Sequence, residues 1–480
     1  MRFFIPNYVE KVIEALMKAG FEAYVVGGAV RDLLLEKEPE DYDVVTNARP
    51  DEIKLVAELN GIGVVAGLGQ NFGVVMLTID RHSVEVAAFR NETYGEDAHR
   101  PAEVWYCDKL EDDLGRRDFT INAMALDSKG EIIDCFDGLG DLQQKILKTV
   151  GNPEKRFEED ALRMFRACRF LGQLGFKYDE KIKTAIKSNL SRVEGLSLER
   201  VRAELNKMVC GSYAQKGMEL LIASGLAGES CRYRAEKTEQ LVPILPELIA
   251  LVGVKQNPAY HQYDVWNHTL AALVNSDRSL EVGWAIILHD VAKGRKGIRG
   301  SNDKGEPTDF GHDILGAKIT KDILSRLHFP VGTVQRVVWL VKNHMRFGSN
   351  IDRDDDVTWR WLRQMARGGD FRINKEMTEG FKQLVAVCVA DLAATTAHRQ
   401  ELIYAQMYGE KLIAMASKMP IHTMDLNISG GDLSLIVPNK KALAEIMPLL
   451  LHRVQDGELA NEEKALQLAA KVWYERCRHR

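Results

Sequence analysis

Two aspartates separated by one residue, Asp41 and Asp43, end the stretch YVVGGAVRDLLLEKEPEDYDVV. Residues i and i+2 of a β-strand point to the same side, so a strand here presents both carboxylates on one face and Tyr42 and Val44 on the other. Like charges held this close are best stabilised by a divalent cation, and hard oxygen ligands suit Mg²⁺ bound together with substrate phosphates. The alternative is a solvated pair of aspartates at a strand edge.

Glycines and a further acidic residue extend this pattern. Gly27 and Gly28 allow a tight turn that exposes backbone N–H groups at the start of the helix carrying Arg31, which favours a triphosphate. Glu85, in SVEVAAFR, alternates with two valines and is either a third metal ligand or an ordinary exposed glutamate. Together these residues predict a site for phosphoryl or nucleotidyl transfer.

The elements that must position these residues form an α/β head with a small mixed sheet and helices. Beyond it the periodicity is almost wholly helical, so we expect a helical neck, a second helical domain and a helical tail. The predicted segments are 1–150, 151–255, 256–400 and 401–480, and the predicted strands are 23–26, 43–45, 73–79, 83–88 and 131–135.

The composition is that of a folded protein without a membrane segment. The chain has 480 residues, 45% of them hydrophobic, and a formal net charge of −5, so any binding of nucleic acid must depend on a local basic surface. There is no apolar run long enough to span a bilayer, and the first twenty residues are typical of an amphipathic helix rather than a signal peptide. The seven cysteines are scattered, without a C-x-x-C pair. We therefore expect a cytoplasmic protein with reduced cysteines.

Five motifs, in order, resemble one family: VVGGAVRDLLL…DYDVVTNARPDEI, VEVAAFR, LEDDLGRRDFTINAMALD, IIDCFDGLGDL and RFEEDALRMFRACRF. They are similar to the nucleotidyltransferases of the DNA polymerase beta superfamily, and within them to the bacterial class II tRNA CCA-adding enzymes and their poly(A) polymerase relatives. The resemblance covers residues 20–175. It implies that Asp41 and Asp43, with Glu85 as a candidate third ligand, hold Mg²⁺ ions that activate the RNA 3′-hydroxyl and clamp the leaving pyrophosphate.

The resemblance also assigns the nucleotide contacts. Gly27, Gly28 and Arg31 are expected at the phosphates. In RRDFTINA the residues that would hold the triphosphate and ribose are Arg117, Asp118 and Asn122.

Base selection is expected from the stretch EEDALRMFRACRF. There Asp160, Arg163, Arg166 and Arg169 recur every three residues, so neighbours can share a helix face, either as a salt-bridged surface helix or as a binding surface. The resemblance places Asp160 and Arg163 at the Watson–Crick edge of the base. An Asp accepts from the amino group of adenine or cytosine while an Arg donates to the ring nitrogen, so ATP and CTP are admitted and GTP and UTP rejected. Arg166 and Arg169 would be further nucleotide contacts.

The sequence leaves open which member of the family this chain resembles most in activity. The segment from 89 to 119 keeps what resembles a full flexible loop, including Arg100 and Pro101, which disfavours an enzyme that adds only C. Full CCA addition and addition of the terminal A both remain, and a poly(A) polymerase is a further alternative. The tail resembles the segment that grips the tRNA elbow, although Ser-Gly-Gly-Asp stands where Asn-Gly is common.

A series of histidines between residues 262 and 391 resembles the HD superfamily of metal-dependent phosphohydrolases. The resemblance implies a divalent metal, Ni²⁺, Mn²⁺ or Fe²⁺, bound by His268, His289, Asp290 and Asp391, with His312 and His344 near a second metal or the substrate. The site is either a working phosphohydrolase, acting on RNA ends, or a helical support for tRNA. A third possibility is an RNA-end phosphohydrolase whose head is inactive. The oligomeric state stays open.

Overall fold

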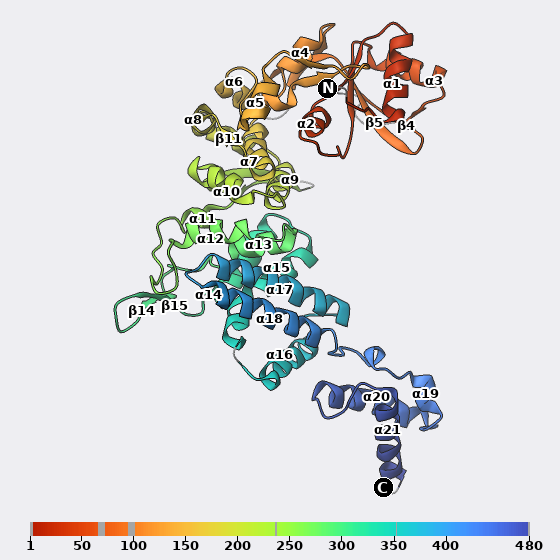
Figure 1. Ribbon diagram of the computed structural model, residues 1–480, viewed down its shortest axis with the longest axis vertical. Helices are drawn as coiled ribbons and strands as arrows, with labels where there is room; N and C mark the ends of the chain where they lie inside the picture. Colours follow the sequence, from red (N-terminus) through yellow and green to blue (C-terminus); the bar gives the residue numbers. More distant parts are fainter. Residues whose placement is uncertain (1–2, 66–72, 95–100, 236–237, 352, 479–480) are drawn as a thin grey trace. The chain divides into compact units, whose positions relative to one another are not determined.

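A mixed sheet organises the first of the two units into which the chain divides, Met1–Ile249 and Ala250–Arg480 (Figure 1). The computed structural model describes residues 3–65, 73–94, 101–235, 238–351 and 353–478. Within them the sheet has seven strands in the order β3-β4-β5-β2-β1-β8-β9, all antiparallel to their neighbours except β2 and β5, which are parallel. The strands are β1 (Ala23–Val26), β2 (Asp43–Thr46), β3 (Gly63–Val64), β4 (Val74–Ile79), β5 (His82–Ala88), β8 (Met124–Leu126) and β9 (Ile132–Asp134).

The five strands predicted from the sequence are confirmed, with ends that differ by at most one residue. The strand β8 was not predicted, although it lies between β1 and β9 in the sheet. All three of its residues are buried, and so short an apolar run shows no alternation that would distinguish a strand from a buried helix segment.

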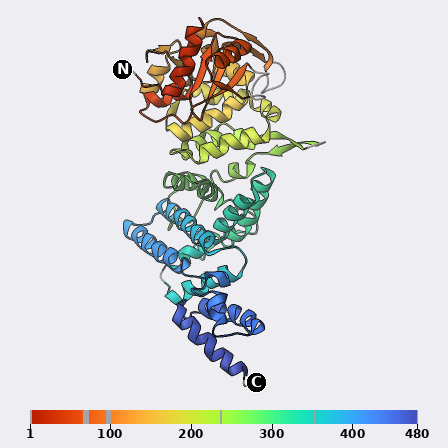
Figure 2. The ribbon, with the colours of Figure 1, turned by 90° about the vertical axis from the view of Figure 1, so that its right-hand side faces the viewer.

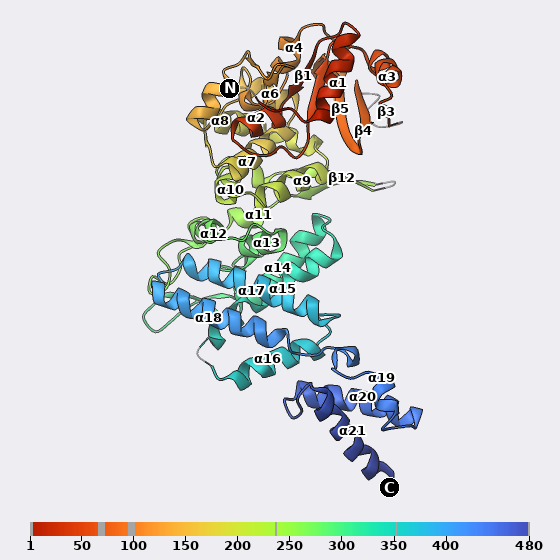
Figure 3. The same cartoon turned by 45° about the vertical axis from the view of Figure 1, so that its right-hand side comes forward.

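Helices α1 (Asn7–Lys18) and α3 (Pro50–Leu59) lie together against one face of this sheet (Figures 1 and 3). Helix α1 confirms the amphipathic helix expected at the start of the chain, and it buries Val9, Val12, Ile13, Ala15 and Leu16. On this scaffold β1 leads into α2 (Gly28–Leu34), so the residues that follow β1 and those that begin β2 are brought to the same end of the sheet.

The segment expected to be a flexible loop contains a hairpin in this structure. Strands β6 (Arg90–Tyr94) and β7 (Pro101–Tyr106) pair antiparallel, and helix α4 (Leu110–Gly115) follows. Pro101 begins β7, whereas Arg100 lies outside the described residues. The high β-strand propensity of Thr, Val, Trp and Tyr in these two segments accounts for the strands.

The rest of the first unit is mostly helical. Its core is α7 (Leu162–Leu174), which packs against α9 (Leu198–Val209) and α10 (Ala214–Ala223). The contact is close because glycines face it: a Cβ on Gly217 would lie 2.4 Å from the carbonyl oxygen of Cys168. The other elements here are α5 (Gly138–Gln144), β10 (Ile146–Leu147), α6 (Pro153–Glu159), β11 (Lys177–Tyr178), α8 (Glu180–Ser188) and α11 (Pro246–Ile249), with a hairpin of β12 (Ser230–Ala235) and β13 (Thr238–Pro243) that projects from the helices (Figures 2 and 3).

The second unit is built around α13 (Leu280–Leu288), whose residues from Val282 to Leu288 are all buried. Helices α12 (Val265–Val274), α15 (Val331–Asn350) and α17 (Asn374–Ala393) pack around it, which explains an apolar sequence with no polar face. The remaining elements are β14 (Arg299–Ser301), β15 (Pro307–Asp309), α14 (His312–Arg326), α16 (Asp355–Arg367) and α18 (Arg399–Ala416).

The C-terminal helices of this unit have a small core of their own. Helices α19 (Gly430–Ser434), α20 (Lys440–Gln455) and α21 (Glu463–Arg478) bury a cluster that includes Leu433, Ile446, Leu450 and Leu466. The indole Nε1 of Trp359 on α16 donates to the carbonyl oxygen of Gln455 at 2.8 Å, which connects this cluster to α16. Among the described residues no helix is both long and apolar enough to cross a bilayer.

Candidate active site and a second, histidine-rich site

The acidic residues of the head meet through strand pairing. Asp43 begins β2 and stands opposite Val26 of β1 and Glu85 of β5, so the carboxylates of Asp43 and Glu85 start from neighbouring positions. Glu85 is exposed while Val84 and Val86 beside it are buried, which is the alternation expected from the sequence.

The prediction that one strand carries both aspartates is wrong, because β2 begins at Asp43 and Asp41 lies in the segment before it. Strand β1 ends at Val26, the partner of Asp43, and the chain then turns at Gly27 into α2. Asp41 therefore has no position on β1 to pair with. It nevertheless lines the same cleft as Asp43 and Glu85.

Negative charge accumulates at this end of the sheet. Burial, together with the charges of Glu85 and Asp41, raises the pKa of Asp43 to about 6 against the opposing effect of Arg117. The ligand atoms of the three carboxylates do not all lie within 4.8 Å of one another; among the described residues such groups of three occur only in the second unit. The donor set is carboxylate oxygen alone, which fits Mg²⁺ held jointly with the phosphates of a substrate.

The glycine turn adjoins two of the predicted phosphate contacts. Gly27 has a φ of 74°, and a Cβ at this position would lie only 2.9 Å from Nη1 of Arg117, so both the backbone and the neighbouring guanidinium favour glycine. One helical turn later, Nη1 of Arg31 donates to Oδ1 of Asn122 at 2.8 Å. Residues predicted from separate motifs are thus in direct contact.

Asp118 organises the RRDFTINA block from a buried position. Its Oδ1 accepts from Nδ2 of Asn122 at 3.1 Å, and its Oδ2 forms an ion pair with Arg166 at 2.6 Å. Burial alone would raise the pKa of Asp118, but the charge and hydrogen bond of Arg166 outweigh it and lower the pKa to about 2. Asp118 is therefore an ionised anchor that fixes Arg166 and Asn122.

Asp113 is a residue that the sequence-based prediction missed. Its carboxylate is fully buried on α4 and forms ion pairs with Arg116 at 2.7 Å and Arg117 at 3.3 Å. The spacing of i, i+3 and i+4 between an acid and two arginines on a helix is the signal that could have identified it. Asp113 positions the guanidinium groups that face the cleft.

The stretch predicted to select the base begins differently from expectation. Helix α7 starts at Leu162, so Asp160 does not share its face; it is extended, and its Oδ1 accepts from the backbone N–H of Leu162 at 3.0 Å. The reason is a break between α6 and α7 at this residue, where the side chain replaces a missing backbone partner. Burial raises the pKa of Asp160 against the opposing charges of Arg200 and Arg163.

The three arginines of this stretch do share helix α7. Each has an acidic partner: Glu159 for Arg163 at 2.7 Å, Asp118 for Arg166, and Glu204 for Arg169 at 3.1 Å. The arginines are salt-bridged, but because Arg163 and Arg169 are buried, the alternative of a salt-bridged surface helix is wrong.

All of the residues predicted for the head line one cleft, of about 1370 Å³. They come from the glycine turn, from β2 and β5, and from the segments before and along α7. The set comprises Gly27, Gly28, Arg31, Asp41, Asp43, Glu85, Arg117, Asp118, Asn122, Asp160, Arg163, Arg166 and Arg169. The structure thus joins an acidic end and a guanidinium-rich wall, an arrangement suited to a nucleoside triphosphate.

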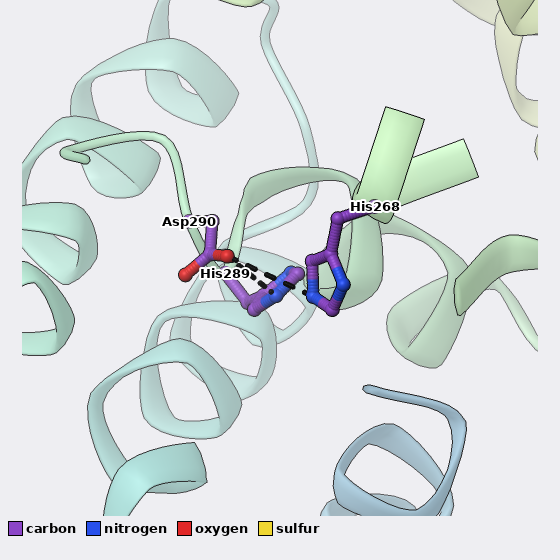
Figure 4. Close-up of side chains that lie close together, drawn as sticks. All are labelled: His268, His289 and Asp290. Atoms are coloured by element: carbon purple, nitrogen blue, oxygen red, sulfur yellow. Dashed lines mark ion pairs between the residues drawn. The ribbon is translucent and has the colours of Figure 1, made fainter. Parts of the chain in front are cut away.

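The predicted ligands of the second unit also converge. Nε2 of His289 lies 3.1 Å from Oδ2 of Asp290, and Nε2 of His268 lies 3.9 Å from the same oxygen, with both rings turned toward the carboxylate (Figure 4). Asp391 of α17 completes the set, since its Oδ1 is 2.8 Å from Nε2 of His268 and 3.6 Å from Nε2 of His289.

His312 and His344 form a second group on the other side of Asp290. Nε2 of His312 lies 3.3 Å from Oδ1 of Asp290 and 3.3 Å from Nε2 of His344. The ligand atoms of His268, His289 and Asp290 lie within 4.8 Å of one another, and so do those of Asp290, His312 and His344. Asp290 is shared by both groups.

The histidine rings are oriented as metal ligands are. Nδ1 of His289, His312 and His344 each lies 2.7 Å from a backbone carbonyl oxygen, which leaves Nε2 facing the cluster. Nε2 of His289 and both carboxylate oxygens of Asp290 are buried without a hydrogen-bond partner of good geometry among the described residues. Burial and the charges of His289 and His312 lower the pKa of His344 to about 4, so this imidazole is neutral. The residues fit a divalent metal with mixed imidazole and carboxylate ligands.

Comparison with known families agrees with these two sites. The family model described as the poly A polymerase head domain matches residues 23–148, which contain the acidic residues and the RRDFTINA block. A model described as the probable RNA and SrmB-binding site of polymerase A matches residues 175–229, and the HD domain matches residues 259–379. The resemblances stated from the sequence are thereby confirmed, and of the four HD ligands only Asp391 lies beyond the matched range.

Curated proteins similar to this chain include CCA-adding enzymes. One from Lactobacillus delbrueckii subsp. bulgaricus is 45% identical over 230 residues, which cover 48% of this chain and 57% of that protein. Another, from Enterococcus faecalis, is 45% identical over 217 residues, covering 45% of this chain and 52% of that protein. The chain spans about half the length of the curated relatives it matches.

Solved structures share the fold of the chain. The Bacillus stearothermophilus CCA-adding enzyme in complex with CTP has a TM-score of 0.63 at 24% identity and covers 99% of each chain. A tRNA nucleotidyltransferase complexed with a primer tRNA and an incoming ATP analog has a TM-score of 0.53 at 21% identity, covering 84% of this chain and 98% of that one. These likenesses confirm the predicted fold, an α/β head with a small mixed sheet followed by helical domains.

Proposed function

We propose that the chain is a template-independent tRNA nucleotidyltransferase that adds CCA, or its terminal A, to tRNA 3′ ends from CTP and ATP. The observation that carries the proposal is the cleft in which Asp41, Asp43 and Glu85 face arginines drawn from several separate motifs. The CCA-adding relatives support the choice of substrate.

The acidic end of the cleft would hold the metal ions. Asp43 and Asp41 are the proposed ligands of Mg²⁺, with Glu85 beside Asp43 as the third carboxylate. Bound Mg²⁺ supplies acidity at the RNA 3′-hydroxyl and positive charge for the leaving pyrophosphate. Arg31 and Asn122, joined by a hydrogen bond, and Arg117, fixed by Asp113, would orient the triphosphate.

Base choice would depend on Asp160 and Arg163 at the other wall of the cleft. The carboxylate of Asp160 is held by the N–H of Leu162, and Nη2 of Arg163 donates to the carbonyl oxygen of Arg116 at 2.7 Å. A donor and an acceptor fixed in this way match the edges of adenine and cytosine and leave both groups unsatisfied against guanine and uracil.

The test is removal of single carboxylates. Asp41→Ala or Asp43→Ala should lower incorporation of CTP and ATP into tRNA by about a hundredfold or more while the protein stays folded, because each removes a metal ligand. Glu58→Gln, which changes an exposed acid on α3, is the matched control. Turnover like that of the wild type in both aspartate variants would overturn the proposal.

We propose a second activity, metal-dependent phosphohydrolysis of RNA ends, at the HD site. Nε2 of His289 and the oxygens of Asp290 lack a hydrogen bond of good geometry among the described residues and lie buried among oriented imidazoles, which favours a working metal site over a purely helical support. A divalent metal would supply a bound hydroxide as nucleophile. Hydrolysis of a 2′,3′-cyclic phosphate by the wild type but not by His289→Ala is the expected result. If the metal-loaded wild type does not hydrolyse it, the phosphohydrolase proposal is wrong and the role of a helical support for tRNA is favoured.

A further inference from the structure

A loop before α12, residues 256–263, borders the HD site and has no assigned role. Its backbone is bonded to the turn that follows α17, the helix that carries Asp391. The N–H of Thr396 donates to the carbonyl oxygen of Tyr260 at 3.0 Å, and Oγ1 of Thr396 donates to that of Ala259 at 3.2 Å. The loop is therefore held at a fixed place beside the metal ligands.

Two polar side chains lie next to the metal ligands but are not ligands themselves. The ring of His261 packs edge-on against that of His268 with centroids 4.9 Å apart, and its buried Nδ1 has no hydrogen-bond partner among the described residues. Nζ of Lys293 lies 2.7 Å from Oδ2 of Asp290 and donates to Oε1 of Gln256 at 2.8 Å, with its side chain only 11% exposed. A buried ammonium and an unsatisfied imidazole nitrogen can receive the oxygens of a phosphate bound at the metal.

Tyr260 adds an exposed aromatic ring to this loop. It is 66% exposed, so it contributes little to the core, and it directly precedes His261 in the chain. The loop is anchored through the backbone of Tyr260, which leaves its ring available. An exposed ring on a loop that borders the metal ligands suits stacking on a nucleobase, because every base presents a flat π-face.

We propose that this loop, together with Lys293, forms the substrate-binding wall of the HD site, where Lys293 and His261 receive phosphate oxygens and Tyr260 stacks on the base. The substrate class is then a nucleotide or an RNA end rather than a small phosphate ester. The proposal rests on the phosphohydrolase activity proposed above for the same site.

The experiment compares two cyclic esters in the full-length, metal-loaded protein. Uridine 2′,3′-cyclic phosphate carries a base and lacks the triphosphate that the head is expected to bind; ethylene phosphate has the same five-membered ring without a nucleoside. In Tyr260→Ala the ratio of kcat/KM for the uridine ester to that for ethylene phosphate should fall about 5- to 150-fold. Tyr260→Trp should keep the ratio, and Trp105→Ala, which removes a 45% exposed ring from the first unit, is the matched control.

A binding measurement separates this proposal from the activity on which it rests. If the wild type hydrolyses neither ester, the phosphohydrolase activity is wrong, and the fluorescence of Tyr260→Trp decides the binding role. Quenching by uridine 3′-phosphate, beyond that of the wild type and absent with inorganic phosphate, supports a base-stacking wall. An unchanged ratio in active Tyr260→Ala, or no quenching in an inactive protein, overturns it.

Discussion

At the scale of single residues, the pKa of Asp43 shows how strongly negative charge is concentrated in the head. The pKa of this carboxyl is raised by burial and by two neighbouring carboxylates to about 6, whereas it is 3.8 for an ordinary Asp. A raised pKa in an acid means that the folded state holds the proton more tightly than the unfolded chain. Stability is therefore lost as the pH rises from about 4 to 6, and the loss is complete above that range.

Replacing this carboxylate should stabilise the metal-free protein. In EDTA, Asp43→Asn should raise the free energy of unfolding of the first unit by about 1–3 kcal/mol at pH 7.5, with a much smaller gain at pH 4.5. Urea unfolding at the two pH values measures this, with Glu58→Gln as the exposed control. A gain that is equal at both pH values would contradict the charge repulsion inferred for the site.

At the scale of elements, the neck depends on a close approach of helices. A Cβ at Gly217 would stand 2.4 Å from the carbonyl oxygen of Cys168 and 2.7 Å from the side chain of Met208. Helix α7 carries Arg163, Arg166 and Arg169 of the cleft, so a shift of α7 that relieves this contact moves them.

We therefore expect Gly217→Ala to cost the first unit about 1–3 kcal/mol of stability and to weaken nucleotide binding, since helices cannot separate without repacking. Glu219→Ala, at an exposed position on the same helix, should change neither. Urea unfolding and ATP titration measure the two effects. Wild-type stability in Gly217→Ala would show that the contact between α7 and α10 can accommodate a Cβ without loss of packing.

The sequence predicted the site better than it predicted the elements. All the head residues chosen from motifs line one cleft, and the HD ligands converge, because chemistry restricts residue type and order strongly. Strand and helix ends depend on partners distant in the chain: Asp41 falls outside β2 because β1 ends at Val26, and Asp160 falls between two helices. The buried Asp113 was missed because the acidic run that contains it, near an expected loop, is typical of residues exposed to solvent.

At the scale of the whole molecule, the two proposed activities lie in separate units. The carboxylates of the head belong to Met1–Ile249, and every HD ligand belongs to Ala250–Arg480. Metal bound only to the folded form stabilises the unit that binds it.

Removal of transition metal should thus affect one unit only. In Mg²⁺ buffer, 1,10-phenanthroline should lower the unfolding temperature of the second unit by several degrees. A metal whose free concentration is a hundred times its Kd adds about 2.7 kcal/mol to the free energy of unfolding, and the chelator removes this contribution. His289→Ala should unfold at the lower temperature with or without chelator, and Asp43→Asn should respond like the wild type. Differential scanning calorimetry measures both transitions, and an unaffected second unit would contradict a bound transition metal.

The most direct measurement is incorporation of labelled CTP and ATP, with Mg²⁺, into three tRNA transcripts that end at the discriminator base, at C and at CC. We expect C, C and A to be added to the shortest transcript with a fixed stop after A, and addition to be lost in Asp43→Ala. A single A added only to the CC-ending transcript would restrict the activity to the terminal nucleotide. Long homopolymeric products, or no incorporation into any of the three, would contradict the proposed tRNA nucleotidyltransferase.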